Sequence, residues 1–284
     1  MTLSEVVADL DAYFRVPDVE GDARWYPDDD PYWLEFVERD WIERRNGLMV
    51  RGAEDVEQAT TCVFPSVRIL EALRPRTLLF SEHPVDFEDE PGFLPLPREA
   101  FDQMKARGIS FYHVHGPIDQ HPEVSPSRLI ANGLGLADPE EYFPIVEGIP
   151  GGAAVIGEST QTLDDLADRL SALLGPEIPV RLVSRPHEQA GRVAVVAGGG
   201  AQRTILESSL ERGCRTYLTG NAVTRCRLEF VQDEVRGFLA LARQADVAVV
   251  DATHYGTEKP PQLAMVDWFR ARGLAAEFVP DGPK

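Results

Sequence analysis

The chain has 284 residues, of which 43% are hydrophobic, and its 47 acidic and 28 basic side chains give a formal net charge of -19 at pH 7. This length and hydrophobic content predict a folded protein of two subdomains or one large α/β unit. The negative charge disfavours nonspecific binding of nucleic acid and attracts divalent cations, although a generic acidic surface accounts for most of it.

The sequence shows no targeting or membrane-spanning pattern. Its first residues are acidic and amphipathic and lack the basic and apolar regions of a signal peptide. No apolar run approaches the roughly 20 residues needed to cross a bilayer. The three cysteines, Cys62, Cys214 and Cys226, form no C-x-x-C pair and favour a reducing compartment. We therefore expect a cytoplasmic protein.

A helix is predicted over 3–14, and an acidic, aromatic stretch, Asp18–Arg45, follows it. Asp30 and Pro31 are predicted to begin a second helix inside this stretch. That helix carries one apolar face, formed by Trp33, Phe36, Val37 and Trp41. The pattern favours packing of this face on the core, and the alternative is a lid or a subunit contact.

Strand-like and helix-like segments then alternate, which is typical of an α/β protein. The predicted strands cover 60–64, 77–80, 109–114, 192–196, 216–218 and 247–250. The predicted helices cover 66–72, 98–107, 127–132, 163–174, 202–212 and 233–245. Gly108 is expected to end helix 98–107. Pro260 and Pro261 are expected to open the last helix, because first-turn N–H groups have no intrahelical partner.

Three predicted strands end in side chains that can bind metal. These are Glu82 and His83 after the first, His115 and Asp119 after the second, and His254 and Glu258 after the last. Ligands of open α/β sheets bind at the carboxyl ends of the strands, imidazole suits transition metals, and carboxylates bridge cations. One such histidine alone is explained by an ordinary hydrogen bond, and Asp119 alone by a turn. Three groups at equivalent strand ends indicate a metal site.

Six segments occur in an order that resembles the NIF-three-like (NGG-interacting factor three) family, whose members also carry the name GTP cyclohydrolase I type 2-like. The segments are Asn46–Val50, Leu78–Pro84, Tyr112–Asp119, Val193–Gly200, Tyr217–Gly220 and Asp251–Glu258. The resemblance extends from about Asn46 to the C-terminus, and the H-Y-x-T-E pattern at 254–258 is its most specific element.

The resemblance implies a ligand set taken from a His-His-Pro pair, the Asp of an H-T-N-L-D-like motif, and the His and Glu of H-Y-x-T-E. The matching positions are His83, Asp119, His254 and Glu258, while Glu82 stands where the family has its first histidine. Three carboxylates and two imidazoles are expected to hold two divalent ions. The candidate ions are manganese, iron, zinc and magnesium, and a set rich in carboxylates favours manganese, magnesium or ferrous iron over the zinc of an imidazole-rich site.

Other polar residues near these motifs receive smaller roles. His115 is predicted to orient a ligand or carry a proton. His113 is predicted to be a hydrogen-bonded structural residue, and His121 to lie at the surface. The turn Gly198–Gly200 lacks the rest of a dinucleotide fingerprint. Asn221 is a candidate substrate contact, although turn chemistry is a sufficient explanation for it.

The resemblance implies an α/β, NIF-three-like fold of two subdomains with mixed sheets flanked by helices, and a metal site at strand ends between them. We place the subdomains at 1–125, with 18–45 as an insert at a cavity entrance or subunit contact, and at 126–284. The expected assembly is a homohexameric toroid.

The predicted function is that of a dinuclear divalent-metal-dependent hydrolase. It uses a metal-activated water and acts on a nucleotide or phosphorylated small molecule, as in GTP cyclohydrolase chemistry. The alternative is a non-catalytic metal-binding scaffold or regulatory partner protein. Neither function involves a membrane or nucleic acid.

Overall fold

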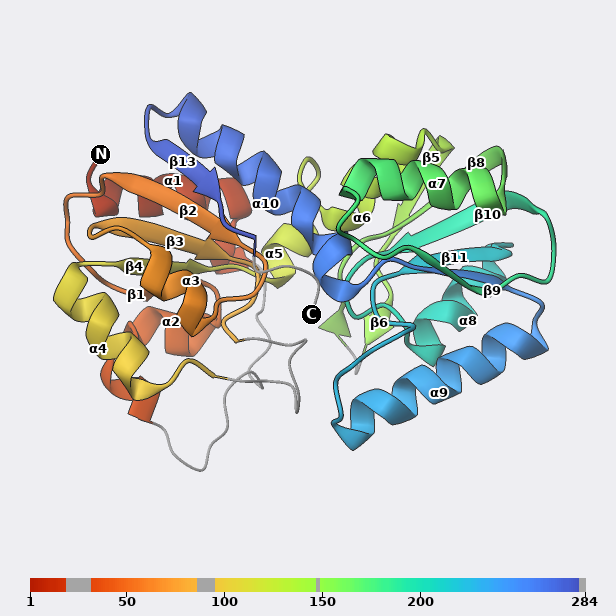
Figure 1. Ribbon diagram of the computed structural model, residues 1–284, viewed down its shortest axis with the longest axis horizontal. Helices are drawn as coiled ribbons and strands as arrows, with labels where there is room; N and C mark the ends of the chain where they lie inside the picture. Colours follow the sequence, from red (N-terminus) through yellow and green to blue (C-terminus); the bar gives the residue numbers. More distant parts are fainter. Residues whose placement is uncertain (19–31, 86–94, 147–148, 281–284) are drawn as a thin grey trace. The chain divides into compact units, whose positions relative to one another are not determined.

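A computed structural model describes residues 1–18, 32–85, 95–146 and 149–280 (Figure 1). They form two compact α/β units, each built on a sheet flanked by helices. The first unit holds the described residues of 1–118 together with 262–280, and the second holds those of 119–261. The sequence-based division at 125 lies close to the first crossing, but it differs at the C-terminus, because the chain returns to the first unit after Pro261.

The sheet of the first unit has the order β1-β4-β3-β2-β13. Its strands are β1 (Gly47–Val50), β2 (Gln58–Cys62), β3 (Thr77–Ser81), β4 (Ser110–His113) and β13 (Ala275–Phe278). All are parallel except β1, which is antiparallel to β4. Every residue of β3 and β4 is buried, as expected for parallel strands covered on both faces. Their carboxyl ends therefore share one edge, and Glu82, His83 and His115 follow there.

The helices of this unit begin and end where local signals place them. They are α1 (Leu3–Phe14), α2 (Arg39–Arg44), α3 (Val67–Ala72) and α4 (Arg98–Arg107), with 3₁₀ helices η1 (Val16–Asp18) and η2 (Tyr32–Glu35). Thr2 and Glu5 form a capping box at the start of α1. Gly108, at φ 64°, ends α4 as predicted.

In the aromatic stretch before β1, the secondary structure differs from the prediction, but the predicted burial of its apolar side chains is observed. Asp30 and Pro31 lie outside the described residues. Instead of one continuous helix, η2 and α2 are separated by Val37, which forms an isolated bridge with Val50. Trp33 and Trp41 are buried with ring centroids 6.2 Å apart. The prediction that this face packs on the core is confirmed, and the continuous helix was wrong because the backbone of Val37 pairs with β1.

The sheet of the second unit has the order β5-β8-β10-β11-β12-β9. Its strands are β5 (Ala137–Tyr142), β8 (Ala154–Thr162), β9 (Arg181–Ser184), β10 (Gln189–Val196), β11 (Thr216–Thr219) and β12 (Ala248–Asp251), and β6 (Ile145–Val146) and β7 (Ile149–Pro150) form a separate hairpin. The central strands β10, β11 and β12 are parallel, and the outer pairings are antiparallel. The carboxyl ends of the central strands therefore lie side by side.

The second unit contains α6 (Pro126–Leu134), α7 (Leu163–Leu174), α8 (Arg203–Glu211) and α9 (Glu229–Gln244). The predicted leucine face of α7 is confirmed: Leu163, Leu166, Leu170 and Leu174 are all buried. Two helices continue across the crossings between units, α5 (Gly116–Asp119) and α10 (His254–Ala271). No helix in the described part of the chain is both long and apolar enough to cross a bilayer.

Candidate metal centre

Helix α10 begins at His254, shortly after β12, and runs through Pro260 and Pro261. The prediction that the prolines open this helix was therefore wrong. The start signal is Thr253, whose Oγ1 accepts the N–H of Gly256 at 2.9 Å. A Ser or Thr side chain that satisfies a first-turn N–H is the usual helix cap.

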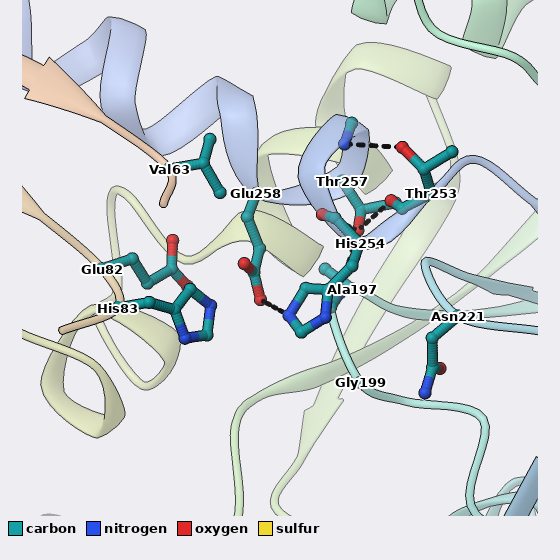
Figure 2. Close-up of polar contacts among 12 residues, drawn as sticks. Val63, Glu82, His83, Ala197, Gly199, Asn221, Thr253, His254, Thr257 and Glu258 are labelled. Atoms are coloured by element: carbon teal, nitrogen blue, oxygen red, sulfur yellow. Dashed lines mark hydrogen bonds and ion pairs between the residues drawn. The ribbon is translucent and has the colours of Figure 1, made fainter. Parts of the chain in front are cut away.

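This earlier start places His254 and Glu258 one turn apart on the same helical face. Nε2 of His254 lies 2.8 Å from Oε1 of Glu258, and Figure 2 shows the two side chains pointing toward each other. They are only 7% and 3% exposed. An imidazole nitrogen and a carboxylate oxygen thus converge in a buried place within the second unit, which is the donor chemistry of a transition-metal site.

The turn before α10 holds a strained residue. Thr253 has φ 59°, a left-handed conformation that is a genuine outlier for a β-branched residue. Asp251 maintains this turn, since Oδ2 accepts the N–H of Thr253 at 3.4 Å and Oδ1 accepts that of Val223 at 3.1 Å. The turn aims His254 away from the strand and into the face that it shares with Glu258.

Two glycines make room for this helical turn. A Cβ on Gly198, which has φ 62°, would lie 2.1 Å from Oε1 of Glu258 and 3.2 Å from Nε2 of His254. A Cβ on Gly220 would lie 2.4 Å from Oγ1 of Thr257. That hydroxyl in turn accepts the N–H of Gly198 at 2.9 Å. The turns after β10 and β11 therefore close around the start of α10, and Oε1 of Glu258 and Nε2 of His254 occupy the space that a side chain at 198 would need.

Asn221 has a structural role in the same group of turns. Its Oδ1 accepts the N–H of Ala201 at 2.7 Å, which ties the turn after β11 to the one after β10. Turn chemistry accounts for this residue, and its contact with a substrate stays a prediction.

Burial raises the pKa of Asp251 to about 6, against the lowering effect of the N–H groups of Val223 and Thr253. The ordinary value is 3.8, so the folded protein binds this proton more tightly than the unfolded chain does. The contribution of Asp251 to stability is therefore greatest below pH 4, falls between about pH 4 and 6, and is level above that.

Asp251→Asn is expected to remove this fall. The difference in unfolding free energy between the parent and the variant should change by roughly 3 kcal/mol between pH 4 and pH 7, because one pKa unit corresponds to about 1.4 kcal/mol. Urea unfolding of the metal-free protein at several pH values measures it. The same change at the exposed Asp233 is the control, and a difference that stays constant with pH for Asp251→Asn would contradict the expectation.

In the first unit, two further candidate ligands lie in the turn after β3. Glu82 and His83 are fully buried there. The hydroxyl of Ser81 donates to the carbonyls of His83, at 2.8 Å, and Val63, at 2.9 Å. Nε2 of Gln262 donates to Oε2 of Glu82 at 3.2 Å. Glu82 therefore points toward α10 rather than to solvent.

His115 joins His83 at this edge. Their ring centroids lie 4.9 Å apart, and the His83 ring also packs on Phe64 at 4.8 Å. The backbone N–H of His115 donates to Oδ1 of Asn46 at 2.9 Å. The expected neighbourhood of His115 and His83 at the carboxyl ends of β3 and β4 is confirmed within this unit.

His113 is the structural histidine that the sequence predicts. Nε1 of Trp41 donates to its Nδ1 at 3.1 Å, and its side chain is fully buried. Burial, followed by the charges of His115 and His83, lowers the pKa of His113 well below its ordinary value. It is therefore neutral at physiological pH, with Nδ1 as a hydrogen-bond acceptor.

Trp41→Phe is expected to lower the unfolding free energy by about 1–3 kcal/mol, because it leaves a buried acceptor on His113 without its donor. Trp268→Phe is the matched control, since Nε1 of Trp268 makes no hydrogen bond among the described residues. Chemical denaturation of the two variants measures the difference. Equal losses would show that ring packing alone explains the effect.

His121 differs from its prediction. It is 8% exposed, and its Nδ1 accepts the N–H groups of Glu123, at 3.2 Å, and Val124, at 3.3 Å. The prediction that His121 lies at the surface was wrong. Its neighbours in the sequence are polar, but its imidazole is buried and accepts hydrogen bonds from its own turn.

The candidate ligands flank both places where the chain passes between the units. His115 belongs to the first unit and Asp119 to the second, and α5 joins them. Glu258 belongs to the second unit, and Gln262, one turn later on α10, belongs to the first. Side chains of the types that can bind metal therefore occur near both places where the chain passes from one unit to the other.

The fold is that of an α/β protein, and its buried His–Glu pair consists of side chains that could bind a metal ion. The model of the Duf34/NIF3 (NGG1p interacting factor 3) family matches residues 37–278, so the chain belongs to this family.

Named relatives and solved structures agree with this assignment. A Vibrio cholerae protein named "GTP cyclohydrolase 1 type 2 homolog" is 27% identical over 251 residues, which cover 82% of this chain and 88% of the relative. The structure titled "Structural genomics, protein ybgI, unknown function" has a TM-score of 0.68 at 20% identity and covers 100% of both chains. TTHA1606 from Thermus thermophilus has a TM-score of 0.61 at 24% identity and covers 98% of this chain and 97% of its own. These structures share the fold.

Proposed function

We propose that the protein is a divalent-metal-dependent hydrolase that acts on a nucleotide or phosphorylated small molecule. The observation that carries the proposal is the buried pair of His254 and Glu258, whose ligand atoms lie 2.8 Å apart beside Gly198. An imidazole nitrogen and a carboxylate oxygen that lie together in a buried place are suitable ligand atoms for a divalent cation.

In this proposal Glu82 and His83 complete the centre with Asp119, His254 and Glu258, and the set holds two divalent ions. Burial of Glu82 and its hydrogen bond from Nε2 of Gln262 support its part in the set, because they hold this carboxylate in place within the first unit. Manganese, magnesium or ferrous iron suits a set with three carboxylates.

Two divalent ions, when bound, supply hydroxide near neutral pH and stabilise charge on a reacting substrate. The side chains of the chain fix where this chemistry takes place. The buried turns after β10 and β12 hold the side chains of His254 and Glu258 next to each other. His115, packed on His83, is the proposed proton carrier, because an imidazole can accept and release a proton near pH 7.

The names of the relatives support the substrate class, since several are called "GTP cyclohydrolase 1 type 2 homolog". We further propose a homohexamer in the cytoplasm. Three buried cysteines, none of them in a C-x-x-C pair, support a reducing location. Light scattering of the purified protein tests the assembly, and a monomeric mass would refute it.

Metal analysis combined with a nucleotide panel tests the function. We expect close to two metal equivalents per chain, and metal-dependent release of phosphate or formate that Asp119→Ala abolishes. Full metal occupancy without turnover would instead favour a non-catalytic metal-binding scaffold or regulatory partner. Less than one tightly held equivalent, unchanged by His254→Ala, would overturn both.

A further inference from the structure

A basic pocket lies at the amino ends of β3 and β4, the edge of the first sheet opposite His83 and His115. Its volume is about 600 Å³, and it is lined by the turns after β1 and before β3 and by the carboxyl end of α4. Four of its lining residues are cationic and none is acidic: Arg51, Arg76, Lys105 and Arg107. This concentration is notable in a chain of net charge -19 whose only lysines are at 105, 259 and 284.

Two of these cations have no carboxylate partner in the described part of the chain. The guanidinium of Arg107 donates to the backbone carbonyls of Leu70, at 2.9 Å, and Leu73, which fixes its position without balancing its charge. Lys105 is exposed and makes no ion pair with a described residue. Their charges therefore add in the pocket.

The other two cations are held only by exposed ion pairs. Arg51 pairs with Glu38 at 3.1 Å, and Arg76 pairs with Glu57 at 3.1 Å and with Asp55 at 3.7 Å. Exposed pairs of this kind contribute little free energy, so an entering anion can compete for both guanidinium groups. Guanidinium forks also match the geometry of phosphate oxygens.

Two backbone carbonyl groups at the pocket are occupied by hydrogen bonds. The carbonyl of Arg107 accepts the N–H of Arg76 at 3.0 Å, and that of Gly108 accepts the N–H of Ala53 at 3.1 Å. Basic residues in the last turn of α4 are also expected from the helix dipole. The dipole does not explain why Arg51 and Arg76, from two other turns, line the same pocket.

We propose that this pocket binds a compact phosphate-type anion, such as a diphosphate group, at a site separate from the metal centre. The volume is in the range of small-molecule sites. The site is distinct from the proposed substrate site, because β3 spans five residues, roughly 15 Å, between Arg76 and the turn of His83. A ligand here would act as an effector or an anchored second substrate group.

Calorimetric titration of the metal-free full-length protein with pyrophosphate tests the proposal, with EDTA present to exclude binding through metal. We expect binding that weakens with added salt, and at least tenfold weaker binding for Lys105→Gln and for Arg51→Gln. Arg203→Gln, an exposed paired arginine on α8, is the matched control and should bind as the parent does.

Guanosine diphosphate forms a second arm of the titration. Equal affinity for the two ligands would identify the diphosphate group as the part that the pocket recognises. Tighter binding of guanosine diphosphate would show that the pocket also contacts the nucleoside. Absence of binding at millimolar pyrophosphate, or binding unchanged in both Lys105→Gln and Arg51→Gln, would overturn the proposal. Because metal is excluded, this result is independent of the hydrolase proposal.

Discussion

Glu258→Gln is expected to lower metal affinity at least about 100-fold, since even residues behind a ligand change affinity by 10- to 100-fold. The amide keeps nearly the same shape and can still accept a hydrogen bond from Nε2 of His254. The metal-free protein should therefore keep its fold. Titration with manganese, followed by the metal-dependent shift of the unfolding midpoint, measures the loss.

Asp267→Asn is the control for this experiment. It makes the same chemical change on the same helix, but at a carboxylate that is 84% exposed and pairs with Arg270 at 3.8 Å. It should bind metal as the parent does. Equal metal affinity in Glu258→Gln and Asp267→Asn would remove Glu258 from the ligand set.

Gly198→Ala is expected to damage stability and metal binding together. The new Cβ would lie 2.1 Å from Oε1 of Glu258, and the left-handed φ of 62° is unfavourable for alanine. Backbone strain of about 1–2 kcal/mol adds to the displacement of a buried carboxylate, so we expect a loss of roughly 2–4 kcal/mol in unfolding free energy. Most bound metal should be lost as well.

Gly199→Ala separates this effect from a general intolerance of the turn. Gly199 has no atom within 4 Å of a built Cβ, and its φ is outside the left-handed region. The variant should have parental metal content and a stability within about 1 kcal/mol of the parent. Urea unfolding and metal analysis of both variants give the comparison. Similar losses in the two would show that Gly198 is not required to make room for the Glu258 carboxylate.

The sequence predicts elements well where the determining interactions are local. Helices α1 and α7 match their predictions because a cap residue and a 3.6-residue apolar repeat lie within the segment itself. Helix α4 ends at Gly108 for the same reason. Strands β5 and β8 were not predicted, because β5 is mostly exposed and the far half of β8 leaves the core, so neither has a continuous apolar pattern.

The candidate site shows the same contrast. The spacing of His254 and Glu258 is visible in the sequence. Their common helical face, however, requires a helix that begins at His254 after the cap residue Thr253, whereas the two prolines led to a later predicted start. The fit of Gly198 and Gly220 around this helix could not be predicted, because it arises from three turns far apart in the chain. The sequence shows a predicted strand followed by Gly or by Thr-Gly at these positions. This pattern is common to many tight turns, so it does not predict the fit around the helix.

Strand β13 has a consequence for the order in which the protein folds. Figure 1 shows it beside β2, with which it pairs in parallel, and the helix before it places Phe269 against Phe80 at 5.9 Å. During synthesis, residues 262–280 leave the ribosome after the whole of 119–261. The first unit to be translated is therefore the last to be completed, and its nascent β2 keeps an unpaired edge until β13 arrives.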